Sequence, residues 1–397
     1  MDEHEGEQIS RRRFLCRTAG SAVIALTAGE LWWLASRTNA ADPLEKPSFI
    51  TRVERPQNLE TPVTAFTSWL TPNDRFFVRS HFGPPTAESL KNWHLHVEGD
   101  VTQRLALSLA DLKQFDEVTV TAVIQCSGNG RAYFTPKVPG AQWEKGAVGN
   151  AAWTGVRLAD VLTRAGLGPT AKHVQMLGAD HPILPTVPLF IRSIPIDKAL
   201  HPSTLLAYQM NGESLPLLHG APLRLIAPGW VGDACVKWLT HLNIQPLEAE
   251  GHFMKHAYRM PNRPIQPGMP VKPSETVPME EMPVKSIIAQ PEDGAGMATS
   301  DVLVIQGVAW TGEGEVMRVE VSIDQGTSWQ VAELVGEQTP YAWRRWQYRW
   351  KGAVPGHHTV LSRATDSRGQ VQPVTTPWNP GGYLWNAVDQ IRITITG

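Results

Sequence analysis

Hydrophobic and polar positions follow different patterns on the two sides of residue 260. Between residues 43 and 260, short apolar runs typical of strands alternate with short amphipathic stretches and frequent Pro and Gly breaks. The runs predict strands at 93–97, 118–124, 173–177 and 223–226, and helices at 107–115 (Ser108 as N-cap), 158–165 and 196–200. Helices this short do not indicate a regular doubly wound sheet. The pattern therefore predicts an α+β domain with mixed sheets over 43–260.

Beyond the middle of the chain the hydrophobic period becomes two. Strands are expected at 302–305, 316–323, 329–334, 343–350 and 359–365, with turns at 324–327 and 366–369. Short strands at this spacing predict an all-β immunoglobulin-like sandwich over 284–397. Seven prolines between residues 261 and 283 forbid a helix there and predict an extended linker between the two domains.

Composition narrows the class of protein. The 397 residues carry a net charge of −2, with 42% hydrophobic and 19% charged residues, which indicates a globular chain of two or three domains. The near-neutral charge argues against a nucleic-acid-binding protein. Three cysteines exclude a disulfide framework and a four-cysteine zinc or iron–sulfur site. No Cys-x-x-Cys-His motif is present, so no haem is expected in this chain.

The N-terminus has the pattern of an export signal over residues 1–41. Residues 10–15 read Ser-Arg-Arg-Arg-Phe-Leu, an apolar run covers 19–35, and small residues follow at 38–41. The paired arginines favour the twin-arginine variant, with cleavage near Ala40 and a periplasmic mature protein. A permanent membrane anchor is the alternative, but Thr27, Gly29 and Glu30 interrupt the run, which is short for a span. The mature chain then keeps Cys126 and Cys235.

Cys126 is the first candidate for chemistry. It follows the predicted strand 118–124 and opens a Gly-rich turn, in which the backbone can approach a ligand closely. Arg131 supplies positive charge nearby, which favours the thiolate. A buried, unreactive structural cysteine is the alternative.

Two further segments carry groups that bind anions. In an extended segment, Arg79 and His81 point the same way and form a small anion-binding pair, or simply a polar surface strand. His219, Arg224 and Lys237 are potential cations around two Gly-containing turns, which suits a phosphate. The standard nucleotide-binding loops are absent. The pair His94 and His96 is interpreted as ordinary sheet histidines.

Together, these segments resemble the sulfite oxidase family of molybdenum enzymes over nearly all of residues 60–395. The resemblance rests on short motifs that occur in the family's order. They are Phe77-x-Arg79-x-His81, Gln125-Cys126-x-Gly128-Asn129-x-Arg131, Trp143, 149–158, 193–195, Asn211-Gly212, His219-Gly220-x-Pro222-x-Arg224, 236–239, 251–258 with Tyr258, 321–329, and 364–373. No single motif decides the family, but the ordered series is very specific.

The resemblance implies a molybdopterin-binding domain followed by a dimerisation domain, with one molybdenum–molybdopterin cofactor per chain. Cys126 would be the protein's ligand to the metal, since soft thiolate sulfur suits it. The resemblance places the substrate beside Arg79, Arg131, Tyr258 and Trp143. The residues implied for the pterin and its phosphate are Phe77, His81, Asp180, His219, Arg224, Cys235 and Lys237.

The implied reaction is oxidation of sulfite, or a related small sulfur oxyanion, with electrons passed to an external acceptor such as a cytochrome c. A homodimer or a haem-carrying partner subunit is expected.

Two departures from the family's sequence pattern stand out. An arginine common near the family's C-terminus is replaced in 378–383 by Trp-Asn-Pro-Gly-Gly-Tyr, for which Arg368 could substitute, and Asp233-Ala234 stands where many relatives have Ala-Arg. The alternatives left open are a sulfane-sulfur dehydrogenase with a haem partner, a sulfoxide reductase and a non-catalytic exported binding protein.

Overall fold

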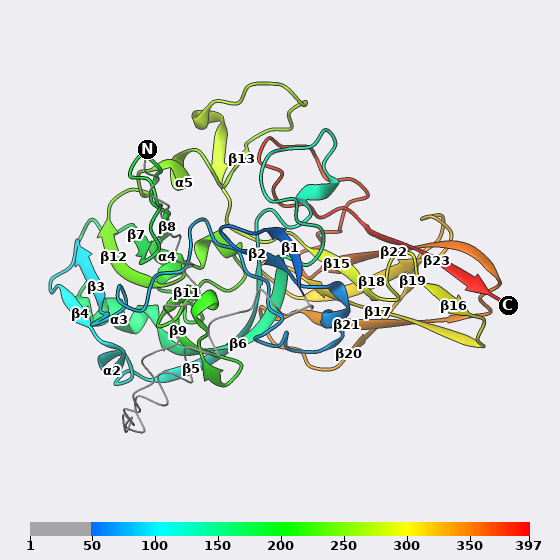
Figure 1. The fold of residues 1–397 in the computed structure, drawn as a ribbon, viewed down its shortest axis with the longest axis horizontal. Helices are drawn as coiled ribbons and strands as arrows, with labels where there is room; N and C mark the ends of the chain where they lie inside the picture. Colours follow the sequence, from blue (N-terminus) through cyan, green and yellow to red (C-terminus); the bar gives the residue numbers. More distant parts are fainter. Residues whose placement is uncertain (1–48) are drawn as a thin grey trace, which may run out of the picture. The chain divides into compact units, whose positions relative to one another are not determined.

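The computed structural model describes residues 49–397, so the predicted export signal over 1–41 lies outside the described residues. Within 49–397, no helix is long and apolar enough to cross a membrane. The described chain begins with a hairpin of β1 (Ile50–Val53) and β2 (Asn58–Glu60), followed by η2 (Val63–Thr67). Figure 1 shows β1 and β2 near the middle of the view.

Residues up to about 260 form two five-stranded sheets with short helices, as the predicted α+β domain requires. One sheet has the order β10-β9-β6-β5, with β11 also paired to β9, and its pairings are antiparallel. The second has the order β4-β3-β12-β7-β8, in which only the β3–β12 pair is parallel. The bounds are β3 (Leu95–Gly99), β4 (Leu105–Leu107), β5 (Glu117–Gln125), β6 (Val148–Arg157), β7 (His173–Gly178), β8 (Ile191–Pro195), β9 (Leu205–Met210), β10 (Glu213–Ser214), β11 (Arg224–Ile226) and β12 (Leu239–Gln245).

All three predicted helices form, two of them shorter than the sequence pattern predicts, and α5 (His252–Lys255) is an additional one. The predicted helix 107–115 contracts to α2 (Leu109–Leu112), because Leu107 ends β4 and the Ser108 hydroxyl caps the helix in a capping box with Asp111. The predicted helix 158–165 is α3 (Leu158–Ala165), whose buried face consists of Leu158, Val161, Leu162 and Ala165. The remaining helical elements are α4 (Ile196–Ala199), α5 (His252–Lys255), η3 (Arg131–Tyr133), η4 (Leu217–His219), η5 (Gly232–Ala234) and η6 (Pro273–Glu275).

The proline-rich segment 261–283 is more structured than the extended linker predicted from its composition. β13 (Arg259–Pro261) pairs with β14 (Thr276–Pro278), and Met279 and Met282 are buried. The prolines at 264, 267, 270 and 273 fall between the two strands, so they remove no hydrogen-bond donors from the ladder.

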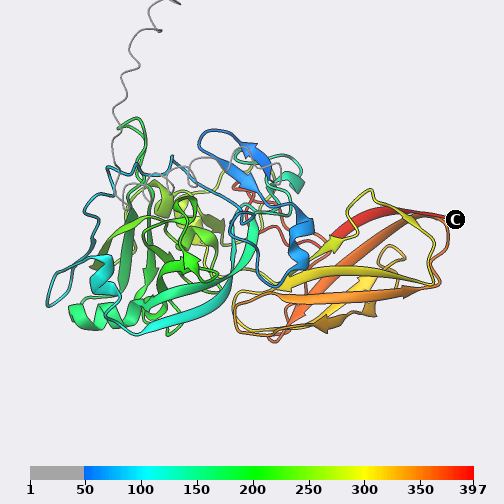
Figure 2. The same ribbon diagram turned by 60° about the horizontal axis from the view of Figure 1, so that its bottom comes forward.

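The C-terminal region is a two-sheet sandwich, seen apart from the mixed sheets in Figure 2. One sheet has the order β15-β17-β21-β20 and the other β16-β23-β22-β18-β19. The predicted strand 329–334 is in fact two short strands, β19 and β20, which belong to different sheets. The bounds are β15 (Lys285–Gln290), β16 (Gly296–Ala298), β17 (Val302–Trp310), β18 (Val316–Ser322), β19 (Gln330–Val331), β20 (Glu333–Val335), β21 (Arg344–Lys351), β22 (Gly356–Asp366) and β23 (Asp389–Thr396).

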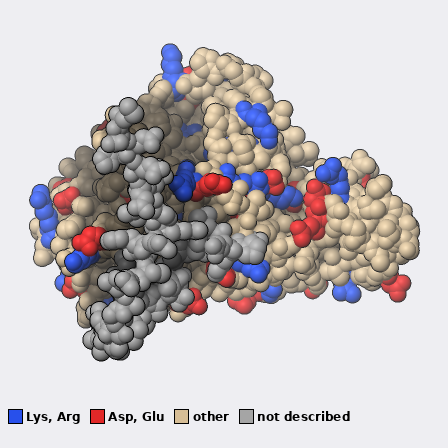
Figure 3. Space-filling model, viewed as in Figure 1, with Lys and Arg blue, Asp and Glu red and all other residues tan. Residues whose placement is uncertain are grey.

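Each of these two regions has its own core, and a third cluster joins them. This cluster includes Val123 of β5, Tyr258, and Trp310 and Trp343 of the sandwich region. Trp310 Nε1 donates a 2.7 Å hydrogen bond to Gln125 Oε1, at the end of β5. The sandwich therefore contacts the residue directly before Cys126. On the face shown in Figure 3, Lys and Arg are interspersed with Asp and Glu.

Candidate active site

The segments singled out in the sequence meet in one pocket of about 700 Å³, part of which is open to solvent. Ten of the twelve predicted site residues line it. They are Phe77, Arg79, His81, Cys126, Asp180, His219, Arg224, Cys235, Lys237 and Tyr258. Arg131 and Trp143 are not part of its wall. The pocket therefore gathers side chains from segments 76–81, 124–127, 218–238 and 258.

Cys126 sits where β5 ends, and its loop is held by the backbone. Its N–H donates to the carbonyl of Ala147 at 2.9 Å, and the side-chain oxygen of Asn129 accepts from the N–H of Ala147 at 3.1 Å. Gly130 has φ +92°, a conformation that favours glycine. The chain therefore turns sharply and leaves the thiol at the pocket wall.

The thiol itself is not activated by the chain alone. Burial raises the pKa of Cys126, and the positive charges of Arg79 and Arg131 only partly oppose this effect. The expectation that Arg131 favours the thiolate is therefore outweighed by desolvation. A bound metal cation is the kind of group that deprotonates such a thiol.

A second part of the pocket wall, here called the cationic end, is formed by Lys237 and Arg224. Lys237 Nζ donates to Ser80 Oγ and to the carbonyl of Leu218, each at 2.9 Å. Arg224 donates to the carbonyls of His219 at 2.8 Å and Cys235 at 3.2 Å, and its buried Nε has no partner. Burial lowers the pKa of Arg224 to about 10. Burial and the neighbouring Arg224 lower the pKa of Lys237 well below its usual value, although Asp180 acts in the opposite direction.

His219 belongs to this end as a neutral group. Burial lowers its pKa to about 3, and Lys237 and Arg224 act in the same direction. Its Nε2 lies 3.0 Å from the carbonyl oxygen of Asn73, so this nitrogen carries the hydrogen and donates. Of the three cations predicted here, His219 is therefore a neutral imidazole at neutral pH.

The two arginines beside Cys126 are oriented by neighbouring backbone and amide groups. Arg79 donates to the carbonyl of Ser80 and, at 3.2 Å, to Asn58 Oδ1. Arg131 donates to the carbonyls of Gly381 and Ala141, each at 3.1 Å. Arg79 lines the pocket, whereas Arg131 is not among the residues of its wall.

Trp143 is not a pocket wall. The side chain is fully buried in the core, and its carbonyl accepts from the N–H of Ala132 at 3.0 Å. Its place is beneath the turn that carries Arg131, so its contribution is to the packing of the loop.

A tyrosine–histidine pair closes the pocket on one side. The Tyr258 hydroxyl lies 2.6 Å from His81 Nε2. Burial, together with Arg79 and Lys237, lowers the pKa of His81 well below its usual value, so the imidazole is neutral and can accept from the phenol. Burial raises the pKa of Tyr258. Phe190 stacks on His81 with ring centroids 4.3 Å apart.

The position of the family's C-terminal arginine is filled differently here. A side chain at Gly381 would collide with the ring of Tyr383, whose atoms lie 2.0 Å from where its Cβ would be. The Tyr383 ring stacks on Tyr258 at 5.6 Å and contacts the Arg131 guanidinium at 5.3 Å. Arg368 does not replace the missing arginine, since it pairs with Glu281 at 2.7 Å and does not line the pocket.

Sequence reasoning missed several pocket residues, among them Ser127, Phe190 and Asp233. Ser127 adjoins Cys126 and could have been included on adjacency alone. Phe190 lies in a loop with no motif. Asp233 was noticed as a departure from the family pattern, but its buried arginine partner, Arg192, is 41 residues away in sequence and no local signal connects the two.

The pocket fits a molybdenum–pterin cofactor in its donor set. The partnerless Nε of Arg224 and the depressed pKa of Lys237 mark an end that favours an anion such as a phosphate. The Cys126 thiol at the other end is a soft ligand for a metal. Among residues 49–397, no group of three or more His, Cys, Asp or Glu side chains is arranged as a metal site.

Comparisons with known proteins agree with this geometry. Residues 81–253 match the family model described as "Oxidoreductase molybdopterin binding domain", and residues 276–396 match "Mo-co oxidoreductase dimerisation domain". Human mitochondrial sulfite oxidase is 38% identical over 375 residues, which cover 90% of this chain and 68% of that protein. Sulfite oxidase of Arabidopsis thaliana is 32% identical over 381 residues, covering 87% of this chain and 95% of that protein.

A solved structure shares the whole architecture. The sulfane dehydrogenase SoxCD from Paracoccus pantotrophus matches with a TM-score of 0.72 and 27% identity, covering 95% of this chain and 93% of that one. Fold and pocket therefore define a molybdopterin oxidoreductase with a C-terminal dimerisation domain. More narrowly, the chain belongs to the sulfite oxidase family. This family membership excludes the non-catalytic binding protein considered from the sequence.

Proposed function

We propose that this enzyme oxidises sulfite to sulfate and passes the electrons to an external acceptor such as a cytochrome c. Sulfite and water give sulfate, two protons and two electrons. The 38% identity to human sulfite oxidase supports this substrate. The observation that carries the proposal is one pocket lined by Cys126 and Arg79 together with Arg224 and Lys237, two cations suited to a phosphate.

The cofactor, when bound, supplies the oxygen-atom and electron chemistry. Cys126 would hold the metal, while Arg224, Lys237 and His219 would hold the pterin and its phosphate. Arg79 would bind the sulfite oxyanion with charge-assisted hydrogen bonds. Arg131, which does not line the pocket, would add to the positive electrostatic potential there. The Tyr258 hydroxyl donates to neutral His81, so its oxygen would accept a proton from the reacting centre while its own proton passes to the imidazole.

A second candidate is the oxidation of a sulfane sulfur. Its support is the 27% identity to the sulfane dehydrogenase SoxCD and the replacement of a cationic side chain at Gly381 by the packed ring of Tyr383. A less cationic pocket suits a substrate with less negative charge than sulfite. A sulfoxide reductase was the remaining enzymatic alternative from the sequence, and neither the matched dimerisation domain nor Tyr258 supports it.

One assay separates these candidates. Purified enzyme with measured molybdenum and pterin content is supplied with sulfite, thiosulfate, a protein-bound persulfide or, with a reduced dye, dimethyl sulfoxide. Sulfite should give the highest kcat/KM with cytochrome c as acceptor. A kcat/KM for the persulfide above that for sulfite would overturn the proposed substrate in favour of the second candidate.

The assembly and location are part of the proposal. The matched dimerisation domain at 276–396 supports a homodimer, with a haem-carrying partner subunit as the alternative. Sedimentation at micromolar concentration should give twice the chain mass.

We also propose export to the periplasm. Replacing Arg11 and Arg12 by Lys should leave the protein in the cytoplasm, and unchanged periplasmic recovery would contradict the twin-arginine signal.

A further inference from the structure

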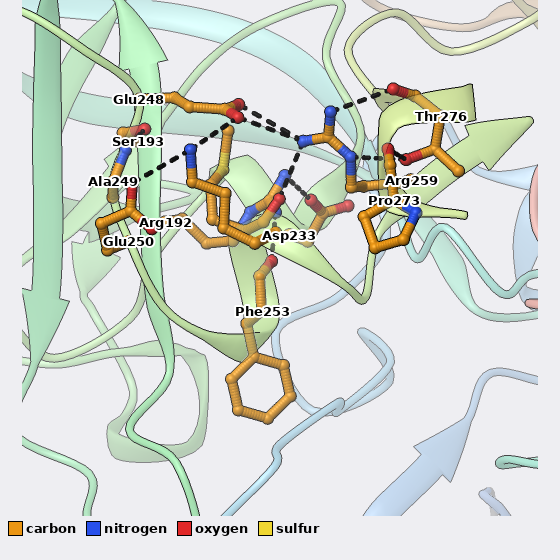
Figure 4. Close-up of polar contacts among 12 residues, drawn as sticks. Arg192, Ser193, Asp233, Glu248, Ala249, Glu250, Phe253, Arg259, Pro273 and Thr276 are labelled. Atoms are coloured by element: carbon orange, nitrogen blue, oxygen red, sulfur yellow. Dashed lines mark hydrogen bonds and ion pairs between the residues drawn. The ribbon is translucent and has the colours of Figure 1, made fainter. Parts of the chain in front are cut away.

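A buried ion pair adjoins the pocket through one of its two residues. Arg192 of β8 and Asp233 of η5 have side chains that are each only 3% exposed, and Arg192 Nη2 lies 2.7 Å from Asp233 Oδ2. Figure 4 shows the guanidinium and the carboxylate facing each other. Asp233 also lines the pocket, whereas Arg192 is not among the lining residues.

Asp233 connects this pair to the cysteine loop. Its other carboxylate oxygen, Oδ1, accepts a buried hydrogen bond from the hydroxyl of Ser127, the residue that follows Cys126. The carbonyl of Ser127 in turn accepts from the N–H of Leu384 at 2.9 Å. The loop that carries the thiol is therefore tied on one side to Asp233 and on the other to the C-terminal region.

Arg192 connects the pair to the tyrosine segment. Its Nη1 donates to the carbonyl of Phe253 in α5, as drawn in Figure 4. Its guanidinium carbon also lies 5.4 Å from the centre of the Tyr258 ring. One ion pair thus contacts the cysteine loop, η5 and the segment that holds the tyrosine.

Stability alone does not account for this arrangement. A buried ion pair has a large desolvation cost, and replacing one by apolar side chains of similar size is often neutral or stabilising. Burial indeed raises the pKa of Asp233, although Arg192 and Ser127 oppose it. What the pair provides, and an apolar pair would not, is directional contact with three segments at once.

We propose that Arg192 and Asp233 are positioning residues that fix the Cys126 thiol relative to the Tyr258 hydroxyl. This inference deepens the proposed function, on which it rests for its kinetic consequence. Neither residue need touch substrate or cofactor. Each acts through another group, Asp233 through Ser127 and Arg192 through Phe253 and the tyrosine ring.

A neighbouring network provides the matched control. Glu248 pairs with Lys255 at 3.0 Å and with Arg259 at 3.3 Å, and Arg259 also donates to Thr276. Figure 4 shows this network beside the buried pair. It supports the same α5 region but does not reach the cysteine loop, and Glu248 is 25% exposed. Glu248→Gln therefore removes an ion pair near the site without removing the link to Cys126.

The main variant is the double substitution Arg192→Met with Asp233→Leu. Because the apolar pair keeps the volume filled, the folded protein and its melting temperature should be largely preserved. In apo-protein, alkylation of Cys126 by iodoacetamide, followed by peptide mass spectrometry, should be at least about 10-fold faster, since its loop is released. In holoenzyme, kcat should fall about 10- to 100-fold with KM within about 2-fold, because misplacement by about 1 Å can cost that much.

Three outcomes decide the proposal. Wild-type alkylation rate and wild-type kcat in a folded double variant would overturn it. An equal loss in Glu248→Gln would also overturn it, since that variant leaves the link intact. If the double variant does not fold, Ser127→Ala decides, because it keeps the ion pair and removes only the tie to the loop; unchanged Cys126 alkylation there counts against the proposal. The alkylation measurement needs no turnover, so it stands even if sulfite proves not to be the substrate.

Discussion

The two ends of the pocket present opposite electrostatic problems. At one end, Arg224 and Lys237 lie close together and their pKa values are lowered, because each is enclosed and Lys237 also experiences the charge of Arg224. At the other end, burial raises the pKa of the Cys126 thiol despite two nearby arginines. The first end favours an added anion and the second an added metal cation.

This contrast identifies the cofactor more sharply than either end alone. A phosphate-bearing pterin that chelates a metal supplies both complements in one molecule, at the two ends of one pocket. The same contrast separates the roles of the residues. Substitutions at the cationic end should change how much cofactor is held, whereas substitutions near Cys126 should change what the held cofactor does.

The largest effect is expected at the metal end. Cys126→Ser replaces a soft thiolate by a hard hydroxyl and should abolish turnover while the fold survives. Steady-state assay with circular dichroism on the same sample checks this expectation. Cys235→Ser is the matched control: its Sγ accepts from the N–H of Ala227 at 3.3 Å, so a hydroxyl there should be tolerated. A Cys126→Ser enzyme with most of its activity would refute the ligand assignment.

At the cationic end, Lys237→Met should remove most of the bound cofactor. Apo-protein with this change should be at least as stable as wild type near neutral pH, because the enclosed ammonium and its desolvation cost are removed. Lys198→Met is the control, since Lys198 is also buried but pairs with Glu313 at 3.0 Å. That variant should lower the melting temperature and leave pterin content unchanged. Pterin fluorescence measures the bound cofactor, and thermal unfolding measures the stability of each variant. Loss of pterin in Lys198→Met but not in Lys237→Met would contradict the assignment of Lys237 to the part of the pocket that holds the cofactor.

Arg79 tests the cysteine end through the substrate. A charge-assisted contact to an oxyanion is worth about 1.5–3 kcal/mol, so Arg79→Met should raise KM for sulfite roughly 10- to 100-fold with a smaller change in kcat. Lys at this position should rescue little, because it lacks the guanidinium fork. Molybdenum occupancy is measured in parallel. Full occupancy with unchanged KM would show that Arg79 does not bind the substrate.

The sequence predicted the pocket's membership better than its electrostatics. Ten predicted site residues line the pocket, because motifs mark the ends of strands and turns where side chains converge. The motifs do not report burial, and burial is what keeps His219 neutral and Cys126 protonated. They also place Trp143 and Arg131 at the wall, although neither is among the residues that line the pocket. The Arg192–Asp233 pair depends on two elements meeting in space, which no local pattern encodes.

The fold shows the same limit. Alternation predicted most sandwich strands because a strand with one buried face shows a period of two, as β22 does. β6 and β9 were missed, since they are buried almost throughout and therefore lack a period of two. The helix predicted at 107–115 was overextended because an apolar residue such as Leu107 suits a strand end as well as a first helical turn.

The smallest expected effect concerns the pH dependence of apo-protein stability. The pKa of His219 is about 3 in the folded chain against an ordinary 6.5, so between these values the unfolded state binds more protons. The stability contributed by neutral His219 is therefore complete above pH 6.5 and is lost as the pH falls toward 3, with a slope of up to about 1.4 kcal/mol per pH unit. His219→Gln keeps an N–H donor for the carbonyl of Asn73. It should reduce this slope by up to about 1.4 kcal/mol per pH unit, which corresponds to one proton. Urea unfolding between pH 4 and 6.5 measures it. Holoenzyme should show a weaker slope than apo-protein, because a phosphate beside His219 favours the imidazolium; equal slopes in both forms would mean that the anion binds elsewhere in the pocket.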